Sequence, residues 1–193
     1  MGMNNFEHDF EDGVILSAGL NWRDLRVCEM GNQEWKIAPR RPAKEFYIES
    51  LGVKEHVSID INGEWGALPL DLTVELPEDL QNRFDLVTNY GTGEHVEDQY
   101  MFFRNVHLVS REGGIIIHEL PCAGSWPGHC HIRYTADFIR ELGIVCGYST
   151  LHSVHCNKYP GNDWTTMLQI AYKKETPQFP DRTIFQQLPI AYE

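Results

Sequence analysis

The stretch FDLVTNYGTGEHV, at residues 84–96, joins an apolar run to a polar turn that contains two glycines. Its first six residues, FDLVTN, are typical of a strand that is covered on both faces. Gly91 and Gly93 then interrupt the run, and Glu94 and His95 follow at once. Apolar side chains recur at helical spacing as far as residue 109. The stretch therefore predicts a strand, a tight turn and a helix over residues 94–109.

Further strands and helices are predicted on both sides of this stretch. Short apolar runs predict strands at residues 26–30, 57–61, 67–70 and 115–120. Helical spacing predicts helices at 42–51 and 135–142, the second with Thr135 as its N-cap and Gly143 just past its end. Two longer strands are expected to pair as an antiparallel hairpin, at 144–152 and 164–173. This order predicts an α/β fold with three α/β/α layers: a Rossmann-like, doubly wound, mostly parallel sheet with an antiparallel last strand.

The composition is that of one globular domain, with 193 residues, 42% of them hydrophobic and 23% charged. We predict an N-terminal arm at 1–23, a core at 24–174 and a C-terminal tail at 175–193. The net charge of −12 counts against a nucleic-acid partner, because phosphate binding needs clustered Lys and Arg. Neither a membrane span nor a secretory signal is recognisable, and five scattered cysteines are typical of reduced thiols. We therefore expect a cytoplasmic protein with no membrane or nucleic-acid partner.

Polar residues follow each predicted strand, where ligands of doubly wound sheets bind. They are Glu29, Gly31, Asn32 and Gln33 after the first strand, Asp60 and Asn62 after the second, Asp71 and Leu72 after the third, and Asn89 and Tyr90 after the fourth. A carboxylate at the position of Asp60 can accept both hydroxyls of a ribose. The loop after the first strand has only Gly31, and the chain has no P-loop pattern, which disfavours NAD and nucleoside triphosphates. S-adenosyl-L-methionine, which has a ribose but no phosphate, fits better.

The order VCEMG, VSIDI, LPLDL, FDLVTNYGTGEHV and REGGIIIHELP resembles that of class I S-adenosylmethionine-dependent methyltransferases of the small-molecule type. Of their glycine-rich first motif, only Glu29 and Gly31 match. The resemblance implies methyl transfer from S-adenosyl-L-methionine to a small-molecule or sugar-like acceptor. It places Glu29, Gly31 and Asn32 at the methionine end, Asp60 at the ribose, Asp71 and Leu72 at the adenine, and Asn89 near the sulfur.

Three residues are candidates for catalysis. His95 is the first candidate for a general base, because an imidazole titrates near neutral pH. Glu94 beside it either takes part in catalysis or complements the dipole of the predicted helix. His129 lies in the loop after the fifth strand, where members of this fold often build the acceptor pocket. Tyr90 and Trp126 are expected to wall that pocket or to contact the sulfonium.

Two other classes of function stay open at this point. One is a non-catalytic binding or regulatory subunit of the same fold, favoured by the glycine-poor first motif and the tail. The other is a zinc-dependent hydrolase or deaminase built on HCH (129–131) and HSVHC (152–156). These spacings match no standard zinc motif, so we predict no metal site. The expected partner is a small-molecule acceptor, and a homo-oligomer or a partner protein also stays open.

Overall fold

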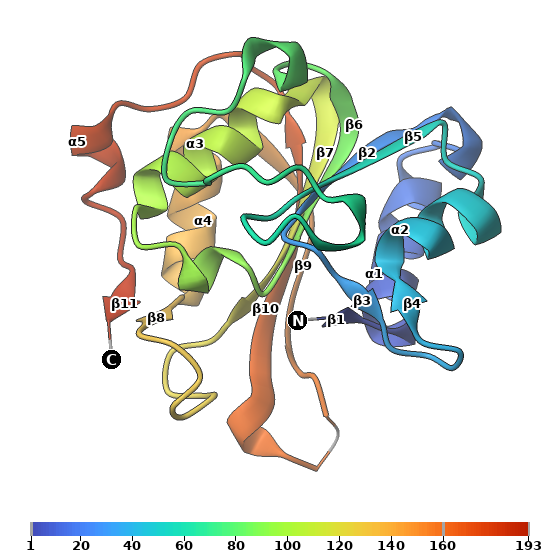
Figure 1. The fold of residues 1–193 in the computed structure, drawn as a ribbon. Coiled ribbons are helices and arrows are strands. Elements are labelled where there is room, and N and C mark those ends of the chain that lie inside the picture. The colour runs from blue at the N-terminus through green and yellow to red at the C-terminus, as the bar shows by residue number, and fades with distance from the viewer. Residues whose placement is uncertain (1, 160, 193) are drawn as a thin grey trace.

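A six-stranded sheet forms the centre of the protein in this computed structural model, which describes residues 2–159 and 161–192 (Figure 1). The strands lie in the order β5, β2, β6, β7, β10, β9. Their bounds are Arg26–Met30 (β2), Glu55–Ile59 (β5), Phe84–Tyr90 (β6), Ser110–Pro121 (β7), Tyr148–Asn157 (β9) and Thr166–Lys174 (β10). The first four strands of the sheet are parallel, whereas β10 is antiparallel to both β7 and β9. The predicted mixed sheet with its terminal hairpin is confirmed.

Helices cover both faces of the sheet and give three layers (Figure 1). On one face lie α1 (Asn5–Ser17) and α2 (Ala43–Glu45), the latter continuing as a π-helical turn at Phe46–Leu51. On the other face lie α3 (Gln99–Val109) and α4 (Ala136–Val145). Every residue of β6 is buried between the two helical layers. The continuous apolar runs therefore mark strands that are covered on both sides, as expected.

The connection from β5 to β6 departs from the usual alternation of strands and helices. The strand predicted at 67–70 is reduced to a single parallel bridge between Ile59 and Leu68. Residues 60–83 contain only short 3-10 turns, at Glu64–Gly66 and Glu78–Leu80. Pro69 and Pro77 lack the backbone N–H that a continuing ladder or helix would use. This irregular connection leaves open space in front of β2 and β5.

The N-terminal arm predicted at 1–23 contains a helix that belongs to one layer of the fold. Asn4 and Glu7 form a capping box at the start of α1, with the Asn4 side chain accepting from Phe6 N–H at 2.8 Å. Glu7 and Glu11 are both fully buried. A second short helical turn follows at Trp22–Asp24. The arm is therefore anchored against the sheet rather than extended.

Several predicted boundaries were wrong. The helix predicted from Glu94 begins only at Gln99, with Asp98 as its N-cap, and Gly93–His95 is a separate 3-10 turn. Gly143 lies inside α4, which continues to Val145 with Cys146 as its C-cap, and the Tyr172 ring stands 3.0 Å from where a Cβ at Gly143 would be. Thr135 caps this helix as predicted. The bounds of the two hairpin strands lie one to five residues further along the chain than predicted.

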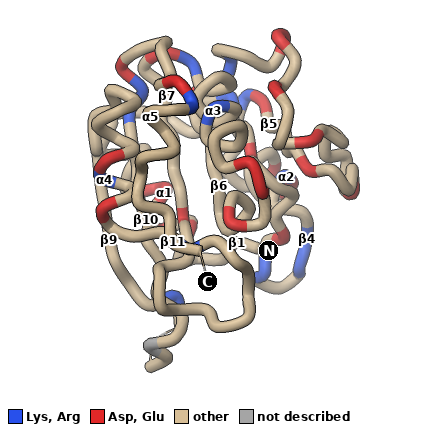
Figure 2. The backbone as a smooth tube through the Cα atoms, turned by 90° about the vertical axis from the view of Figure 1, so that its left-hand side faces the viewer, with Lys and Arg blue, Asp and Glu red and all other residues tan. Residues whose placement is uncertain are grey.

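The termini and remaining short elements close the ends of the sheet. A small sheet forms from β1 (Gly2–Met3), β3 (Glu34–Trp35) and β4 (Arg41–Pro42). The tail forms α5 (Arg182–Phe185) and β11 (Ala191–Tyr192), which pairs with β8 (Ile132–Arg133). A last 3-10 turn spans Asp163–Thr165. Lys and Arg are spread over separate elements (Figure 2). None of the helices in the described ranges has the length and apolar character that crossing a bilayer requires.

Candidate functional site

A cleft of about 390 Å³ opens where β2, β5 and β6 end. This β2–β5 cleft is lined by Gly31, Ile59, Asp60, Ile61, Leu70, Asp71, Leu72, Thr73, Thr92, His95, Val96 and Glu97. Its volume falls within the range of about 300–1,000 Å³ that small-molecule sites occupy. The structure thus brings Gly31, Asp60, Asp71 and Leu72 together at one hollow.

Asp60 holds two loops together at the wall of this cleft. Its Oδ2 accepts from the Asn32 backbone N–H at 2.9 Å, and its Oδ1 accepts from the Asn62 N–H at 3.1 Å. Each carboxylate oxygen can accept a second hydrogen bond. The residue is only partly buried, so that capacity is within reach of a ligand. Asn62 itself is exposed and uses its side-chain oxygen to accept from Glu64 N–H at 2.8 Å.

Asp71 and Leu72 also line the β2–β5 cleft. Asp71 is exposed, and its Oδ1 accepts from the backbone N–H and the hydroxyl of Thr73 at 2.8 and 2.7 Å. These hydrogen bonds, the backbone one first, lower the pKa of Asp71. Leu72 is buried and presents an apolar surface. The wall therefore combines one ionised group with an apolar side chain.

Gly31 forms a turn in the left-handed backbone region at this site. Its φ is +91°, and a Cβ at this position would stand 2.1 Å from Thr92 Oγ1. Gln33, fully buried, donates from Nε2 to the same Thr92 oxygen at 3.3 Å. Both the backbone conformation and the close approach exclude a side chain here. The single glycine of the first motif thus stands where the loop after β2 meets the turn after β6.

Glu29 lies beneath this turn with almost no exposure to solvent. Its Oε2 accepts from Gln33 N–H at 3.3 Å and from Ser58 Oγ at 3.0 Å. Burial raises the pKa of Glu29 to about 8, although these two hydrogen bonds oppose the shift. Within residues 2–159 and 161–192, Glu29 Oε1 and Gln33 Oε1 have no hydrogen-bond partner. Two buried oxygens beside the turn can therefore still accept hydrogen bonds.

Asn89 and Tyr90 are buried, and their polar groups bind other parts of the protein. Asn89 Oδ1 accepts from the N–H groups of Thr92 and Gly93, both at 3.1 Å, and its amide nitrogen lies 3.1 Å from His118 Nδ1. The Tyr90 hydroxyl donates to Glu11 at 2.6 Å. In this structure Asn89 acts on the site by shaping the turn after β6, and Tyr90 ties α1 to the sheet.

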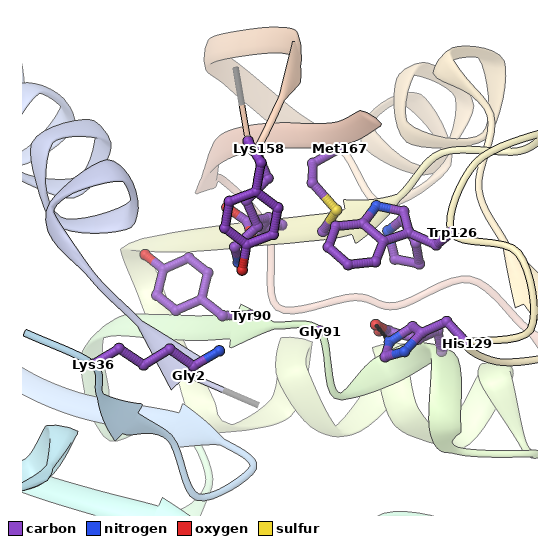
Figure 3. Close-up of a pocket in the computed structure, with 12 residues that line it drawn as sticks. Gly2, Lys36, Tyr90, Gly91, Trp126, His129, Lys158 and Met167 are labelled. Carbon is purple, nitrogen blue, oxygen red and sulfur yellow. Dashed lines mark hydrogen bonds and ion pairs between the residues drawn. The ribbon is translucent and has the colours of Figure 1, made fainter. Parts of the chain in front are cut away.

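A second, smaller pocket of about 110 Å³ lies in front of β6, β7 and β10 (Figure 3). This β6–β10 pocket has Trp126 and His129 on one side and Gly2 and Lys36 on the other (Figure 3). The Trp126 indole donates to Thr166 O at 3.1 Å. The remaining lining residues are Tyr90, Gly91, Glu94, Glu119, Pro121, Lys158, Tyr159 and Met167. Aromatic rings and charged groups thus face the same small space.

The three candidate catalytic residues lie together between the two hollows. The His95 and His129 ring centroids are 4.9 Å apart, with the rings edge to face. His129 Nε2 lies 3.6 Å from Glu94 Oε1. Desolvation by the surrounding protein lowers the pKa of His95, which keeps its imidazole neutral near pH 7. The site therefore holds a neutral imidazole and a carboxylate–imidazole pair.

Sequence reasoning missed a buried ion cluster, two of whose members, Glu119 and Lys158, line the β6–β10 pocket. Lys158 Nζ lies 2.5 Å from Glu7 Oε1 and 2.6 Å from Glu119 Oε1. Gln169 completes the cluster by donating to Glu119 Oε2 at 2.8 Å. The spacing of Asn4 and Glu7 is that of a capping box, so it could have revealed α1 and one member of the cluster. No sequence signal marks Lys158.

The two His/Cys segments do not form the cluster that a zinc hydrolase would need. His152, on β9, packs against Phe10, with the two ring centroids 5.2 Å apart. Cys156, also on β9, faces the backbone oxygen of Met167 and the side chain of Gln169. Among the described residues, the group with three metal-ligating side chains close together consists of Glu94, His95 and His129. Only His129 of the two segments belongs to it.

Comparison with known proteins agrees with this architecture. No family model and no curated protein matches the chain. Among solved structures, the N-methyltransferase NodS from Bradyrhizobium japonicum WM9, in complex with S-adenosyl-L-homocysteine, is similar with a TM-score of 0.60 and 15% identity, covering 89% of this chain and 88% of that chain. A Mesorhizobium loti S-adenosylmethionine-dependent methyltransferase gives a TM-score of 0.58 at 16% identity, over 83% and 96% of the two chains.

A further match is the 1,6-didemethyltoxoflavin-N1-methyltransferase of Burkholderia thailandensis, with bound 1,6-didemethyltoxoflavin and S-adenosylhomocysteine. Its TM-score is 0.58 at 12% identity, and the match covers 84% of this chain and 75% of that chain. At these identities the likeness establishes the fold. The chain has the fold of class I S-adenosylmethionine-dependent methyltransferases, as predicted.

Proposed function

We propose that this protein transfers a methyl group from S-adenosyl-L-methionine to a small-molecule acceptor. The observation that carries the proposal is the Asp60 carboxylate, partly exposed at the end of β5, in a cleft next to the left-handed Gly31 turn. A carboxylate at this point of a doubly wound sheet can accept the hydroxyls of a ribose. The similar solved structures with bound S-adenosylhomocysteine support the choice of cofactor.

The side chains at the β2–β5 cleft match the chemical groups of the cofactor. Leu72 and Val96 offer apolar surface to an adenine ring, and Asp60 can hold the ribose hydroxyls. The partnerless oxygens of Glu29 and Gln33 can accept hydrogen bonds from an ammonium group. Asn32 and Asn62 place Asp60 through the two N–H groups that bind its carboxylate.

The β6–β10 pocket is the proposed acceptor site. When bound, the cofactor supplies a methyl group on a positively charged sulfur, ready for direct displacement by a nucleophile. The chain has to align the acceptor with that group and to remove a proton where the acceptor loses one. His95 is proposed as the base. His129, with Glu94 behind it, is proposed to hold the acceptor and the proton that leaves it. An amine or a sugar-like hydroxyl fits a pocket lined by Glu94, Glu119 and aromatic rings.

Calorimetric titration with S-adenosylhomocysteine tests the cofactor site. Asp60→Asn keeps the size of the side chain and removes its charge. A hydrogen bond to a charged group contributes about 1.5–3 kcal/mol, so we expect the Kd to rise about 10-fold to 150-fold. Asp79→Asn is the matched control, because Asp79 is exposed on the same connection and lies outside the cleft. Unchanged affinity in Asp60→Asn would refute the assignment of Asp60.

A non-catalytic subunit of the same fold is the second candidate. It is favoured by the close packing of Thr92 and Gln33 around the Gly31 turn. This candidate predicts that the folded protein binds neither S-adenosylmethionine nor S-adenosylhomocysteine.

We also propose that the protein works in the cytoplasm, since none of its five cysteines forms a disulfide in the part of the chain described.

A further inference from the structure

Glu94, His95 and His129 present three metal-ligating atoms to one small volume. One ligand atom from each side chain lies within 4.8 Å of the other two. Two ligand atoms bound to one ion at about 2.1 Å, and separated by ordinary coordination angles, stand about 3.0–3.4 Å apart. The distance of 3.6 Å from His129 Nε2 to Glu94 Oε1 already approaches this spacing. His95 and His129 are exposed side chains, so small rotations can bring the third atom into range.

An independent observation points to a missing ligand at the same place. The Glu94 side chain is only 1% exposed. Its Oε2 has no hydrogen-bond partner anywhere in the described ranges, although its other oxygen lies next to His129. Leaving a buried carboxylate oxygen unsatisfied costs free energy, and the cost rises with its charge. A cation bound between Glu94 and the two imidazoles would satisfy it.

The chemistry of the three donors narrows the choice of ion. Two imidazoles and one carboxylate suit divalent transition metals, whereas Mg²⁺ and Ca²⁺ prefer oxygen ligands. Three protein ligands also leave coordination positions open to water or to a substrate.

We propose that Glu94, His95 and His129 bind one divalent transition-metal ion, of the class of Zn²⁺ or Mn²⁺, with open positions for an acceptor. His95 lines the β2–β5 cleft, whereas Glu94 and His129 line the β6–β10 pocket. The ion would therefore lie between the proposed cofactor and acceptor sites. The proposal that an ion binds here depends only on these three side chains and not on the proposed function.

The role of the ion rests on the proposed function. An acceptor that ligates the ion through an oxygen or a nitrogen would be fixed close to the methyl group. The ion would lower the pKa of that atom, so that its proton passes to solvent and its lone pair is free to attack. In the metal-bound protein the two imidazoles serve as ligands, so the role of His95 as the base applies to the metal-free protein. The preferred acceptor class is accordingly a small molecule with a hydroxyl or amine that can coordinate a metal.

The test is a titration of the untagged 193-residue protein with Co²⁺ and, separately, with Zn²⁺. We expect one ion per chain, visible Co²⁺ absorption, and at least a 10-fold loss of affinity in His95→Ala and in His129→Ala. His155→Ala, an exposed histidine on β9, is the matched control and should bind as the wild type does. Circular dichroism confirms that each variant is folded.

The outcomes separate this proposal from the proposed function. Absence of stoichiometric binding, or equal affinity in His95→Ala, His129→Ala and the wild type, overturns the metal site. Loss of binding only in His155→Ala overturns it too, because the ion would then sit on β9. Binding of S-adenosylhomocysteine is measured in parallel with a chelator present. If the metal binds and S-adenosylhomocysteine does not, the metal site stands and the proposed function fails.

Discussion

Replacing Lys158 by methionine should destabilise the protein strongly, and more so at high pH. The Lys158 ammonium lies between the carboxylates of Glu7 and Glu119, whose side chains are 0% and 1% exposed. The variant keeps an unbranched side chain that is one atom shorter and removes its charge. Removing one partner of a buried ion pair costs about 3–5 kcal/mol, because the remaining charge stays buried.

The pH dependence follows from the direction of the pKa shift. Burial raises the pKa of Glu119 to about 7, and Lys158 opposes that rise. Without Lys158 the pKa of Glu119 is higher still, so the folded variant holds a proton that the unfolded chain releases above its ordinary pKa of about 4.5. Its free energy of unfolding then continues to fall above pH 7, by about 1.4 kcal/mol per pH unit, where that of the wild type levels off.

Urea unfolding at pH 6 and pH 9 measures both effects. At pH 6, where Glu119 is protonated in both proteins, we expect the free energy of unfolding of Lys158→Met to be about 1–2 kcal/mol below that of the wild type. At pH 9 we expect the difference to be about 3–5 kcal/mol. Lys173→Met is the matched control, because Lys173 pairs with Glu175 at the surface and such pairs contribute about 0–1 kcal/mol. A loss below 1 kcal/mol at pH 9, or one that does not change with pH, would refute the reasoning.

Two further predictions concern stability. His56 is buried against the Tyr47 ring, with no hydrogen-bond partner for either ring nitrogen among the described residues, and burial lowers its pKa to about 3. The wild type therefore loses stability as the pH falls below 6.5, the pKa of histidine in the unfolded chain. His56→Leu should be about 2 kcal/mol more stable than the wild type at pH 5, and the gain should be smaller at pH 7.5. An equal gain at both pH values would contradict this. Gly31→Ala should lower the free energy of unfolding by about 2–5 kcal/mol, because of the positive φ and the clash of the new Cβ with Thr92. Gly19→Ala should lower it by only about 1–2 kcal/mol, because Gly19 has a φ of +70° but open space around it. Similar losses of Tm in the two glycine variants would contradict the close approach at Thr92.

The strands could be predicted because their signals are local. The apolar run predicted at 84–89 matches β6 to within one residue, whereas the run predicted at 115–120 matches only the second half of β7, which begins at Ser110. Asp60 and Leu72 could be placed at one edge of the sheet because carboxyl ends of parallel strands share an edge. Those two residues now line one cleft, although binding of a ligand there stays a prediction.

The errors arose where distant residues decide the local structure. The helix after β6 starts late because Gly93 packs against the Phe102 ring, where a Cβ would stand 2.6 Å from a ring carbon, and because Asp98 provides the N-cap. Glu94 therefore sits in a separate turn, where it faces His129. These two residues are far apart in the chain, with α3 and β7 between them, so only the fold brings them together.

An NMR titration of the protein with S-adenosylhomocysteine, followed through the backbone amide resonances, locates the cofactor site residue by residue. We expect saturable shifts at Gly31, Asn32, Asp60 and Leu72, and unchanged resonances along β9. Resonances that do not respond, or saturable shifts confined to residues outside the β2–β5 cleft, would contradict the proposed cofactor site.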